Sequence, residues 1–240
     1  MQGEGVPGIV QTMALKYIPL DDALYRYLSG LRSDASDPVL RELREEPSRL
    51  GEISEMQISE EQGTFMSLLV AAIGARSAIE VGTFTGYSSI CIARGLPPDG
   101  RLICLDQSQE WTGIAQRYWL KAGVRDRIEL HIGPAIPALQ TLEAGLSFDF
   151  VFIDAAKTEY DAYYELVLPR VRQNGLILFD NMLWHGRLRG EPVTEPSGRA
   201  IDELNHKLAN DPRIEAVLLP IADGLQLCRK RAGAGVKRGA

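Results

Sequence analysis

The chain has few cysteines and histidines, three of each in 240 residues. Cys91, Cys104 and Cys228 are widely spaced and lie in apolar runs, which is typical of buried free thiols in a reducing compartment. Neither residue type is placed to bind zinc, because zinc sites need cysteine or histidine ligands. The sequence therefore indicates a cytoplasmic protein whose core needs no disulfide and no structural zinc.

Long apolar runs and an excess of positive charge are also missing. No apolar run approaches the roughly 18–20 residues that span a bilayer, and the N-terminus lacks a basic region followed by an apolar core. The 26 Lys and Arg residues against 32 Asp and Glu residues give a net charge of −6, whereas nucleic-acid binding favours a basic face. We therefore expect a small-molecule partner, and neither nucleic acid nor a membrane.

The chain is long enough for one α/β domain with a sizeable core. Hydrophobic residues make up 45% of it and charged residues 24%, as in an ordinary globular protein. We expect a single domain over residues 1–240, with flexible segments at 1–13 and 231–240.

Helical patterns come first along the chain. The expected helices cover residues 21–31, a segment starting at about Asp37 with Pro38 in its first turn, and residues 59–75. Ser59 and Gln62 match a capping box at the start of the third helix.

Strands and helices then alternate. Short apolar runs predict strands at 77–81, 101–106, 128–132, 148–154 and 175–180, and the segments near 87–95, 108–123, 134–144 and 158–172 have helical patterns. Such alternation predicts a parallel sheet with helices on both faces. Residues 214–219 and 225–229 predict an antiparallel hairpin that closes one sheet edge.

The central motif is the sequence Glu-Val-Gly-Thr-Phe-Thr-Gly-Tyr-Ser-Ser at residues 80–89. It predicts a strand, a tight turn with Gly82 and Gly86, and a helix N-terminus, where a ligand can approach the backbone closely. Asp106 ends the next strand, where an acid can accept hydrogen bonds from both hydroxyls of an adenosine ribose.

Two ligands fit this turn, and a turn without a ligand is a third alternative. A nicotinamide dinucleotide would use a pyrophosphate-binding glycine pattern, but here Phe84 stands in the place of a middle glycine. S-adenosylmethionine has no phosphate and needs less anion-binding backbone.

A second constellation lies at the ends of two later strands. Asp154 and the pair Asp180–Asn181 supply two carboxylates and one amide oxygen, which are hard ligands suited to Mg²⁺, Mn²⁺ or Ca²⁺. The alternative is that Asp180–Asn181 forms only a turn. Lys157 follows Asp154 by three residues. A nearby cation and a sulfonium would favour its neutral amine, a possible general base, whereas an isolated lysine would be a solvated surface charge.

The motifs at 80–89, Asp106, 148–157, 180–184 and 219–228 together resemble the cation-dependent O-methyltransferases of the caffeoyl-CoA and catechol type, over nearly the whole chain. The resemblance implies a Rossmann-like class I methyltransferase fold with a seven-stranded, mostly parallel sheet. It also implies a homodimer, and we expect the helices within residues 14–58 to cover the active site or the dimer interface.

The resemblance also implies roles for individual residues. The cofactor S-adenosylmethionine would be contacted by Ile58, Glu80, Gly82, Thr83, Phe84, Ser88, Asp106, Ala135 and Asp154. Asp154, Asp180 and Asn181 would bind the metal ion, Lys157 would act as the base beside Asp154, and Lys16, Trp184 and His185 would contact the substrate.

Three features depart from the plant members of this family. His185 stands where they usually have Asn, Ala156 replaces a common acid, and the loop at 186–200 looks shorter. A shorter loop favours a small catechol-like substrate over a CoA thioester.

The leading hypothesis is thus metal-dependent methyl transfer from S-adenosylmethionine to one hydroxyl of a vicinal dihydroxy-aromatic compound. The alternatives are methylation of a caffeoyl-CoA-like thioester, a nicotinamide-dependent reductase, and a non-catalytic protein that binds S-adenosylmethionine.

Overall fold

A seven-stranded sheet forms the centre of the molecule. The computed structural model describes residues 16–46, 56–188 and 193–233, so the ends predicted to be flexible lie almost wholly outside the described residues. The strands are β1 (Ser77–Val81), β2 (Arg101–Asp106), β3 (Ile128–Ile132), β4 (Phe148–Ile153), β5 (Val171–Phe179), β6 (Ile214–Leu219) and β7 (Leu225–Lys230). Their order is β3-β2-β1-β4-β5-β7-β6, which confirms the predicted sheet.

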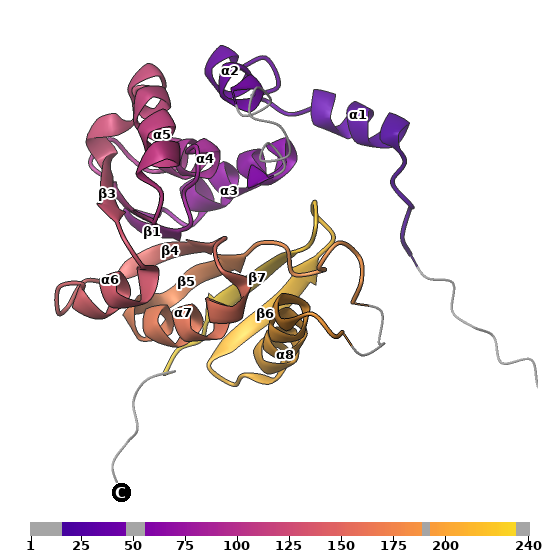
Figure 1. The fold of residues 1–240 in the computed structure, drawn as a ribbon, viewed down its shortest axis with the longest axis vertical. Helices are drawn as coiled ribbons and strands as arrows, with labels where there is room; N and C mark the ends of the chain where they lie inside the picture. Colours follow the sequence, from indigo (N-terminus) through magenta and orange to yellow (C-terminus); the bar gives the residue numbers. More distant parts are fainter. Residues whose placement is uncertain (1–15, 47–55, 189–192, 234–240) are drawn as a thin grey trace, which may run out of the picture.

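The strand directions place the functional ends together. The pairs β1–β2, β1–β4, β2–β3 and β4–β5 are parallel, whereas β7 is antiparallel to both β5 and β6. The carboxyl ends of the first five strands therefore meet at one edge, and the turn between β6 and β7 reaches the same edge (Figure 1). This is the edge where open α/β sheets bind ligands.

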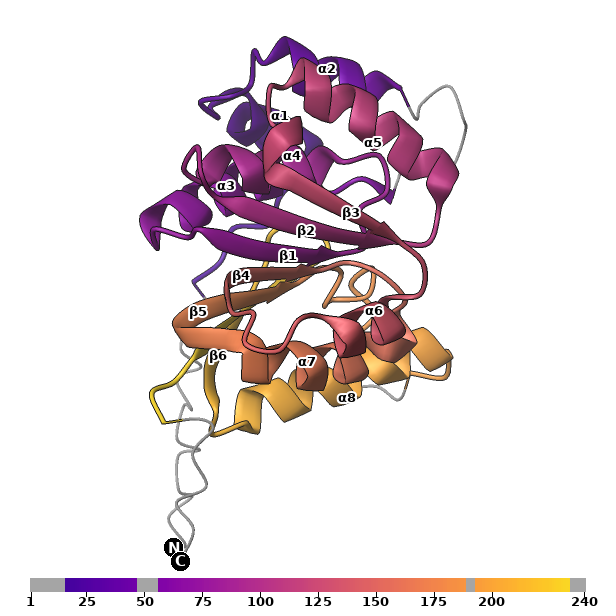
Figure 2. The same ribbon diagram turned by 90° about the vertical axis from the view of Figure 1, so that its left-hand side faces the viewer.

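Helices cover both faces of the sheet. Figure 2 shows α1 (Asp22–Gly30), α2 (Pro38–Glu45), α3 (Glu60–Ala72), α4 (Tyr87–Gly95) and α5 (Gln109–Lys121) on one side, and α6 (Ala135–Thr141), α7 (Tyr160–Val167) and α8 (Pro196–Asn210) on the other. One buried apolar cluster lies under each set. The three cysteines are free and buried, as predicted.

Local sequence explains several helix starts. Asp21 caps α1 through the Leu24 backbone N–H, and Asp37 caps α2 through two backbone N–H groups with Pro38 following it. An aspartate cap and a proline at the first helical position satisfy the free donors of a helix N-terminus. Among the residues that the structure describes, no helix has the length and hydropathy needed to cross a membrane.

Three sequence predictions need correction. The capping box at α3 does not form, because Ser59 makes no side-chain cap bond and Gln62 is fully buried instead. The segment 158–172 is not helical throughout, since β5 begins at Val171 and pairs with β4 after a shift in register. The expected loop at 186–200 ends early, because Pro196 starts α8, which we did not predict.

Candidate functional site

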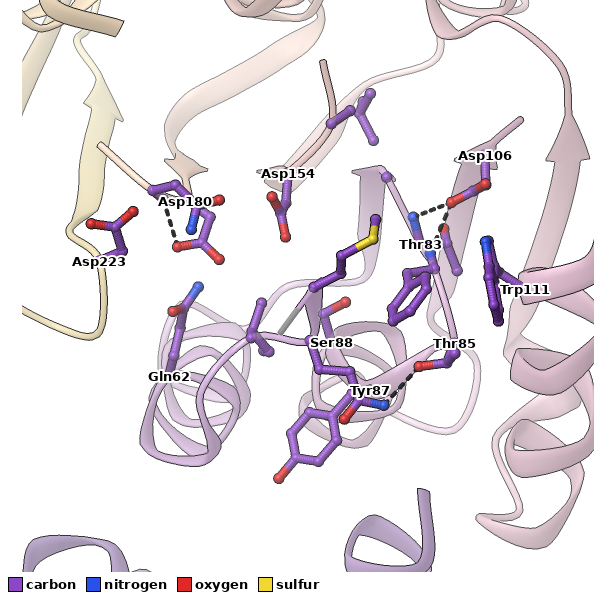
Figure 3. Close-up of a pocket in the computed structure, with 18 of the residues that line it drawn as sticks. Gln62, Thr83, Thr85, Tyr87, Ser88, Asp106, Trp111, Asp154, Asp180 and Asp223 are labelled. Atoms are coloured by element: carbon purple, nitrogen blue, oxygen red, sulfur yellow. Dashed lines mark hydrogen bonds between the residues drawn. The ribbon is translucent and has the colours of Figure 1, made fainter. Parts of the chain in front are cut away.

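A cavity of about 1140 Å³ opens at the carboxyl edge of the sheet. Figure 3 shows its polar wall, with Asp106 on one side and Asp154, Asp180 and Asp223 on the other. Most of the residues predicted for the site line it: Ile58, Gly82, Thr83, Phe84, Ser88, Asp106, Ala135, Asp154, Lys157, Asp180, Asn181, Trp184 and His185. Glu80 and Lys16 do not line this cavity.

The glycine turn after β1 joins the two sides of the cavity. Gly82 has a φ of +90°, and a Cβ atom there would lie 1.8 Å from the carbonyl oxygen of Asp154. Only glycine allows the turn to pack this closely against the end of β4. The turn thus brings the predicted cofactor residues next to the predicted metal ligands.

Asp106 holds this turn in shape. Its Oδ2 atom accepts hydrogen bonds from the backbone N–H groups of Thr83 and Phe84, each at 2.8 Å, and Oδ1 accepts one from Ser108 at 2.7 Å. These bonds fix a backbone in which Phe84 has a φ of +49°. Asp106 also lines the cavity, and a carboxylate has lone pairs for further hydrogen bonds.

Glu80 lies beneath the turn rather than on the cavity wall. It is fully buried, and its Oε2 atom accepts a hydrogen bond from the Cys104 thiol at 3.4 Å. Burial raises the pKa of Glu80 to about 8, although Ser88, Thr83 and Cys104 lower it. The group is therefore largely protonated at neutral pH.

Trp111 is a cavity residue that sequence reasoning missed. Its ring lies 5.2 Å from that of Phe84, measured between centroids, and both rings line the cavity beside Asp106. The available signal was an aromatic residue in the first turn of the helix that follows the acid at the end of β2. Two aromatic rings next to the acid that we predict to bind a ribose suit a flat base such as adenine.

On the other side of the cavity, Lys157 lies between two oxygens. Its Nζ atom donates to Asp154 Oδ1 at 2.8 Å and to the Tyr160 hydroxyl at 2.6 Å. The Lys157 side chain is 15% exposed, so it is not the solvated surface charge of the alternative reading. Tyr160, which we did not predict, is fully buried, and burial with the nearby carboxylates raises its pKa.

Asp180 and Asn181 follow β5 next to Asp154. Asp180 is 3% exposed, and its Oδ1 accepts the backbone N–H of Asn181 at 2.7 Å. Burial raises the pKa of Asp180, and the negative charge of Asp154 raises it further. Two carboxylates that repel each other in a buried place are stabilised by a cation.

The chemistry of this donor set fits a hard divalent cation. Asp154 and Asp180 supply carboxylate oxygens, and Asn181 supplies an amide oxygen on a backbone with a φ of +57°. The described part of the chain holds no cluster of three or more His, Cys, Asp or Glu side chains suited to a metal. The predicted set is of a different kind, with one amide and with room for oxygens of other molecules.

The segment after Asn181 has an unfavourable backbone conformation and is held by hydrogen bonds from a neighbouring turn. Trp184 and His185 have φ values of +49° and +55°, a conformation that is unfavourable for large side chains. Asp223, in the turn between β6 and β7, accepts the backbone N–H of His185 at 2.7 Å and, through its own carbonyl, that of Leu183 at 2.8 Å. The hairpin thus holds Trp184 and His185 at the cavity.

The structure differs from the prediction at three residues: one predicted residue lies outside the cavity, and two residues that we did not predict line it. Lys16 is exposed and stands outside the cavity, so the structure does not bring it to the site. Gln62 and Asp223 line the cavity, but we did not predict either of them as a site residue. Gln62 was hidden by its resemblance to a cap residue, and Asp223 by its position in a hairpin turn.

Comparisons with known proteins show which family the chain belongs to. A family model described as O-methyltransferase matches residues 31–231. Caffeoyl-CoA O-methyltransferase 2 of Petunia hybrida is 37% identical over an alignment of 242 positions, which covers 96% of this chain and 99% of that protein.

Solved structures show the same fold. The O-methyltransferase TomG of Streptomyces achromogenes, in complex with SAM, has a TM-score of 0.81 and 28% identity over 88% of this chain and 96% of that one. An O-methyltransferase from Bacillus cereus in complex with SAH has a TM-score of 0.80 and 31% identity over 87% of this chain and 97% of that one.

These findings confirm the predicted family, fold class and cofactor S-adenosylmethionine, and they exclude the nicotinamide-dependent reductase. The chain belongs to the O-methyltransferase family that includes the caffeoyl-CoA O-methyltransferases, and it is a SAM-dependent methyltransferase.

Proposed function

We propose that the enzyme transfers a methyl group to one hydroxyl of a vicinal dihydroxy-aromatic compound and needs a divalent cation, Mg²⁺ or else Mn²⁺ or Ca²⁺. One observation carries the proposal. Asp154 and the buried Asp180 converge beside Lys157 in the same cavity as the glycine turn.

The cofactor residues would hold S-adenosylmethionine across the turn. Asp106 fixes the turn and faces the cavity, where it would accept the ribose hydroxyls. The other contacts would come from Ile58, Gly82, Thr83, Phe84, Ser88, Ala135 and Asp154, which line the cavity, and from Glu80 beneath it. When bound, the cofactor supplies a methyl group on a positively charged sulfur.

The cation would be held by Asp154, Asp180 and Asn181. When bound, it supplies positive charge that favours the ionised form of a phenolic hydroxyl. The two carboxylates also need such a charge, because burial and mutual repulsion disfavour their shared ionised state.

Lys157 would remove the phenolic proton. Its Nζ atom is oriented by Asp154 and by Tyr160, so a neutral amine there has a fixed direction toward the cavity. With the proton held on Lys157, the substrate oxygen would be free to accept the methyl group that the bound cofactor supplies. Holding oxygen and methyl group close and aligned is worth about 7–11 kcal/mol of barrier in favourable cases.

The substrate would lie against Trp184 and His185. Their rings are 5.3 Å apart between centroids, and both line the cavity. Lys16 would reach the substrate only if the N-terminal segment changed its position. A second candidate substrate is a caffeoyl-CoA-like thioester, which the name of the Petunia hybrida relative favours.

We further propose that the N-terminal helices cover the site in a cytoplasmic homodimer. Tyr25 of α1 and Arg44 of α2 line the cavity. None of the residues of α1 is buried, and Tyr27 and Leu28 are 64% and 43% exposed. An exposed apolar helix face suits a second copy of the chain, and light scattering with size-exclusion chromatography would detect the dimer.

Methyl transfer from labelled S-adenosylmethionine tests the proposed function. The substrates are catechol, a mono-phenol, caffeic acid and caffeoyl-CoA, each with Mg²⁺ and with EDTA. We expect transfer to the vicinal diols only with Mg²⁺. Equal rates with EDTA, or equal rates on the mono-phenol, would contradict the proposal.

A further inference from the structure

The segment just before α3, residues 56–59, forms part of the cavity wall. It contains Ile58, for which we predict a contact with S-adenosylmethionine. Gln57 and Ile58 lie outside all helices and strands, so no regular backbone pairing holds them in place. The position of Ile58 therefore depends on contacts with neighbouring elements.

The side-chain amide of Gln57 bridges α2 and the glycine turn. Its Nε2 atom donates to the backbone carbonyl of Leu43, in the last turn of α2, at 3.1 Å, and to the Thr85 hydroxyl, in the glycine turn, at 2.7 Å. Figure 3 shows the second bond as the dashed line at Thr85. An amide nitrogen carries two hydrogens, so both are used within the protein and neither is left for a ligand.

Arg44, the next residue of α2, holds Ile58. Its Nη2 atom donates to the Ile58 backbone carbonyl at 2.7 Å, and its guanidinium lies over the Tyr87 ring, 4.6 Å from the centroid. Tyr87 is the first residue of α4, directly after the glycine turn. A charged donor makes a stronger hydrogen bond than a neutral one, and stacking on the ring fixes the guanidinium in place. Two neighbouring residues of α2 thus tie Gln57 and Ile58 to the turn.

α2 itself is anchored away from the cavity. Leu40 and Leu43 are 3% and 0% exposed and belong to a buried apolar cluster. Just after the helix, Glu46 accepts hydrogen bonds from the Tyr118 hydroxyl at 2.9 Å and from Arg117 at 2.6 Å, both on α5. None of these five residues lines the cavity, so α2 is a support for the segment 56–59 that needs no ligand to hold it.

We propose that Gln57 and Arg44 are positioning residues for the cofactor: they hold Ile58 and the glycine turn at the separation that S-adenosylmethionine needs. A segment that is fixed before the cofactor arrives loses little freedom on binding, which favours affinity. The inference rests on the predicted contact between Ile58 and the cofactor. It assigns to α2 a function in cofactor binding through residues that act on the segment 56–59.

Two substitutions of similar volume test the bridge. Gln57→Met removes the donor and Thr85→Val removes the acceptor, and calorimetry measures the SAH affinity of both single variants and of the double variant. We expect each single variant to lose about tenfold in affinity. The double variant should bind little more weakly than Gln57→Met, because both changes break the same hydrogen bond.

Arg44 offers a conservative rescue. Arg44→Met keeps the apolar stem but loses the donor, whereas Arg44→Lys keeps a charged donor for the Ile58 carbonyl. We expect Arg44→Met to lose about tenfold in SAH affinity and Arg44→Lys about threefold or less. Arg41→Met and Gln140→Met carry the same substitutions at exposed positions of α2 and α6, and both should bind SAH like the wild type.

Amide hydrogen exchange separates positioning from a structural role. SAH should slow exchange at residues 57–59 in the wild type, and without SAH these amides should exchange faster in Gln57→Met and Arg44→Met than in the wild type. A merely structural role would lower the melting temperature and leave the SAH affinity of the folded protein unchanged. Unchanged SAH affinity in both variants would therefore overturn the proposal. If SAH does not protect residues 57–59 in the wild type, the Ile58 contact fails and the proposal fails with it, whereas SAM-dependent methyl transfer stands.

Discussion

The carboxylates in the two halves of the cavity have different surroundings. In the cofactor half, formed by the turn at 82–88 and the end of β2, Asp106 accepts three backbone hydrogen bonds. In the acidic half, formed by the ends of β4 and β5 and the β6–β7 turn, Asp154 and Asp180 repel each other. The first half is shaped before its ligand arrives, whereas the second is stabilised by its ligands.

This difference suits a methyl transfer between two molecules. The cofactor half has a pre-formed shape, so binding there needs little reorganisation. The acidic half holds two carboxylates that repel each other, one of them buried, and we expect this to make it dependent on a cation. The Gly82 turn packs on the carbonyl of Asp154 and sets the distance between the halves.

Removing the divalent cation should produce the largest difference between the two halves. EDTA should lower methyl transfer to catechol by about 1000-fold, because the acidic half loses the charge that favours the ionised hydroxyl. SAH affinity should stay within about twofold, since Asp106 holds the glycine turn in shape without the cation. A parallel loss of SAH binding would show that the halves are not independent.

Replacing Lys157 should have the next largest effect. Lys157→Ala should lower kcat by about 100-fold or more, the usual contribution of a general base. SAH and Mg²⁺ binding should persist, and Lys121→Ala, on the exposed face of α5, serves as the control. Full activity of Lys157→Ala would remove the lysine from the mechanism.

A change in the cofactor half should be milder. Asp106→Asn keeps one acceptor oxygen but loses the charge, so we expect SAH affinity to fall about tenfold. Mg²⁺ affinity, measured by calorimetry on the same variant, should not change. Weaker Mg²⁺ binding would mean that the turn also positions the acidic half.

The pH dependence of stability gives the smallest effect. Burial raises the folded-state pKa of Glu80 from 4.5 to about 8, so the native state holds a proton that the unfolded state releases in this range. Stability is therefore highest below about pH 4.5 for this group and falls as the pH rises to about 8. We expect the melting temperature to fall by about 5 °C from pH 6 to pH 8.

Saturating Mg²⁺ and the variant Glu80→Gln separate the contributions of the two halves to the change of melting temperature with pH. Asp180 has the same sign, because its folded-state pKa is also raised, and saturating Mg²⁺ should remove its part. Glu80→Gln should remove the Glu80 part with or without Mg²⁺. A rise in melting temperature with pH would contradict both assignments.

The strands were predictable because their short apolar runs end at turn residues or acids, and the central strands β1, β2 and β4 are also largely buried. The bounds of β1, β2, β3 and β6 match the prediction. The start of β5 was missed because Arg172, Gln173 and Asn174 are polar, and they lie in the irregularity between the Val171 and Leu176 pairings with β4. For α8 the signal existed, since Ile201, Leu204 and Leu208 recur at helical spacing and are buried.

The candidate site was only partly predictable for a related reason. Asp154 and Asp180 follow strands directly and Lys157 comes three residues after Asp154, so the topology alone brings them together. Gln62 and Asp223 reach the cavity from a helix and a hairpin turn, and only the packing of those elements decides where their side chains point. The Ser59–Gln62 spacing at the start of α3 is typical of a helix cap, but in this fold Gln62 lines the cavity.

The central claim is that the acidic half requires a cation, and Mg²⁺ calorimetry at two pH values tests it most directly. The account predicts one Mg²⁺ per chain, tighter binding at pH 8 than at pH 6.5, release of protons on binding that is larger at pH 6.5, and a loss of about tenfold or more in Asp180→Asn. Absence of binding, or an affinity that neither the pH nor Asp180→Asn changes, would contradict it.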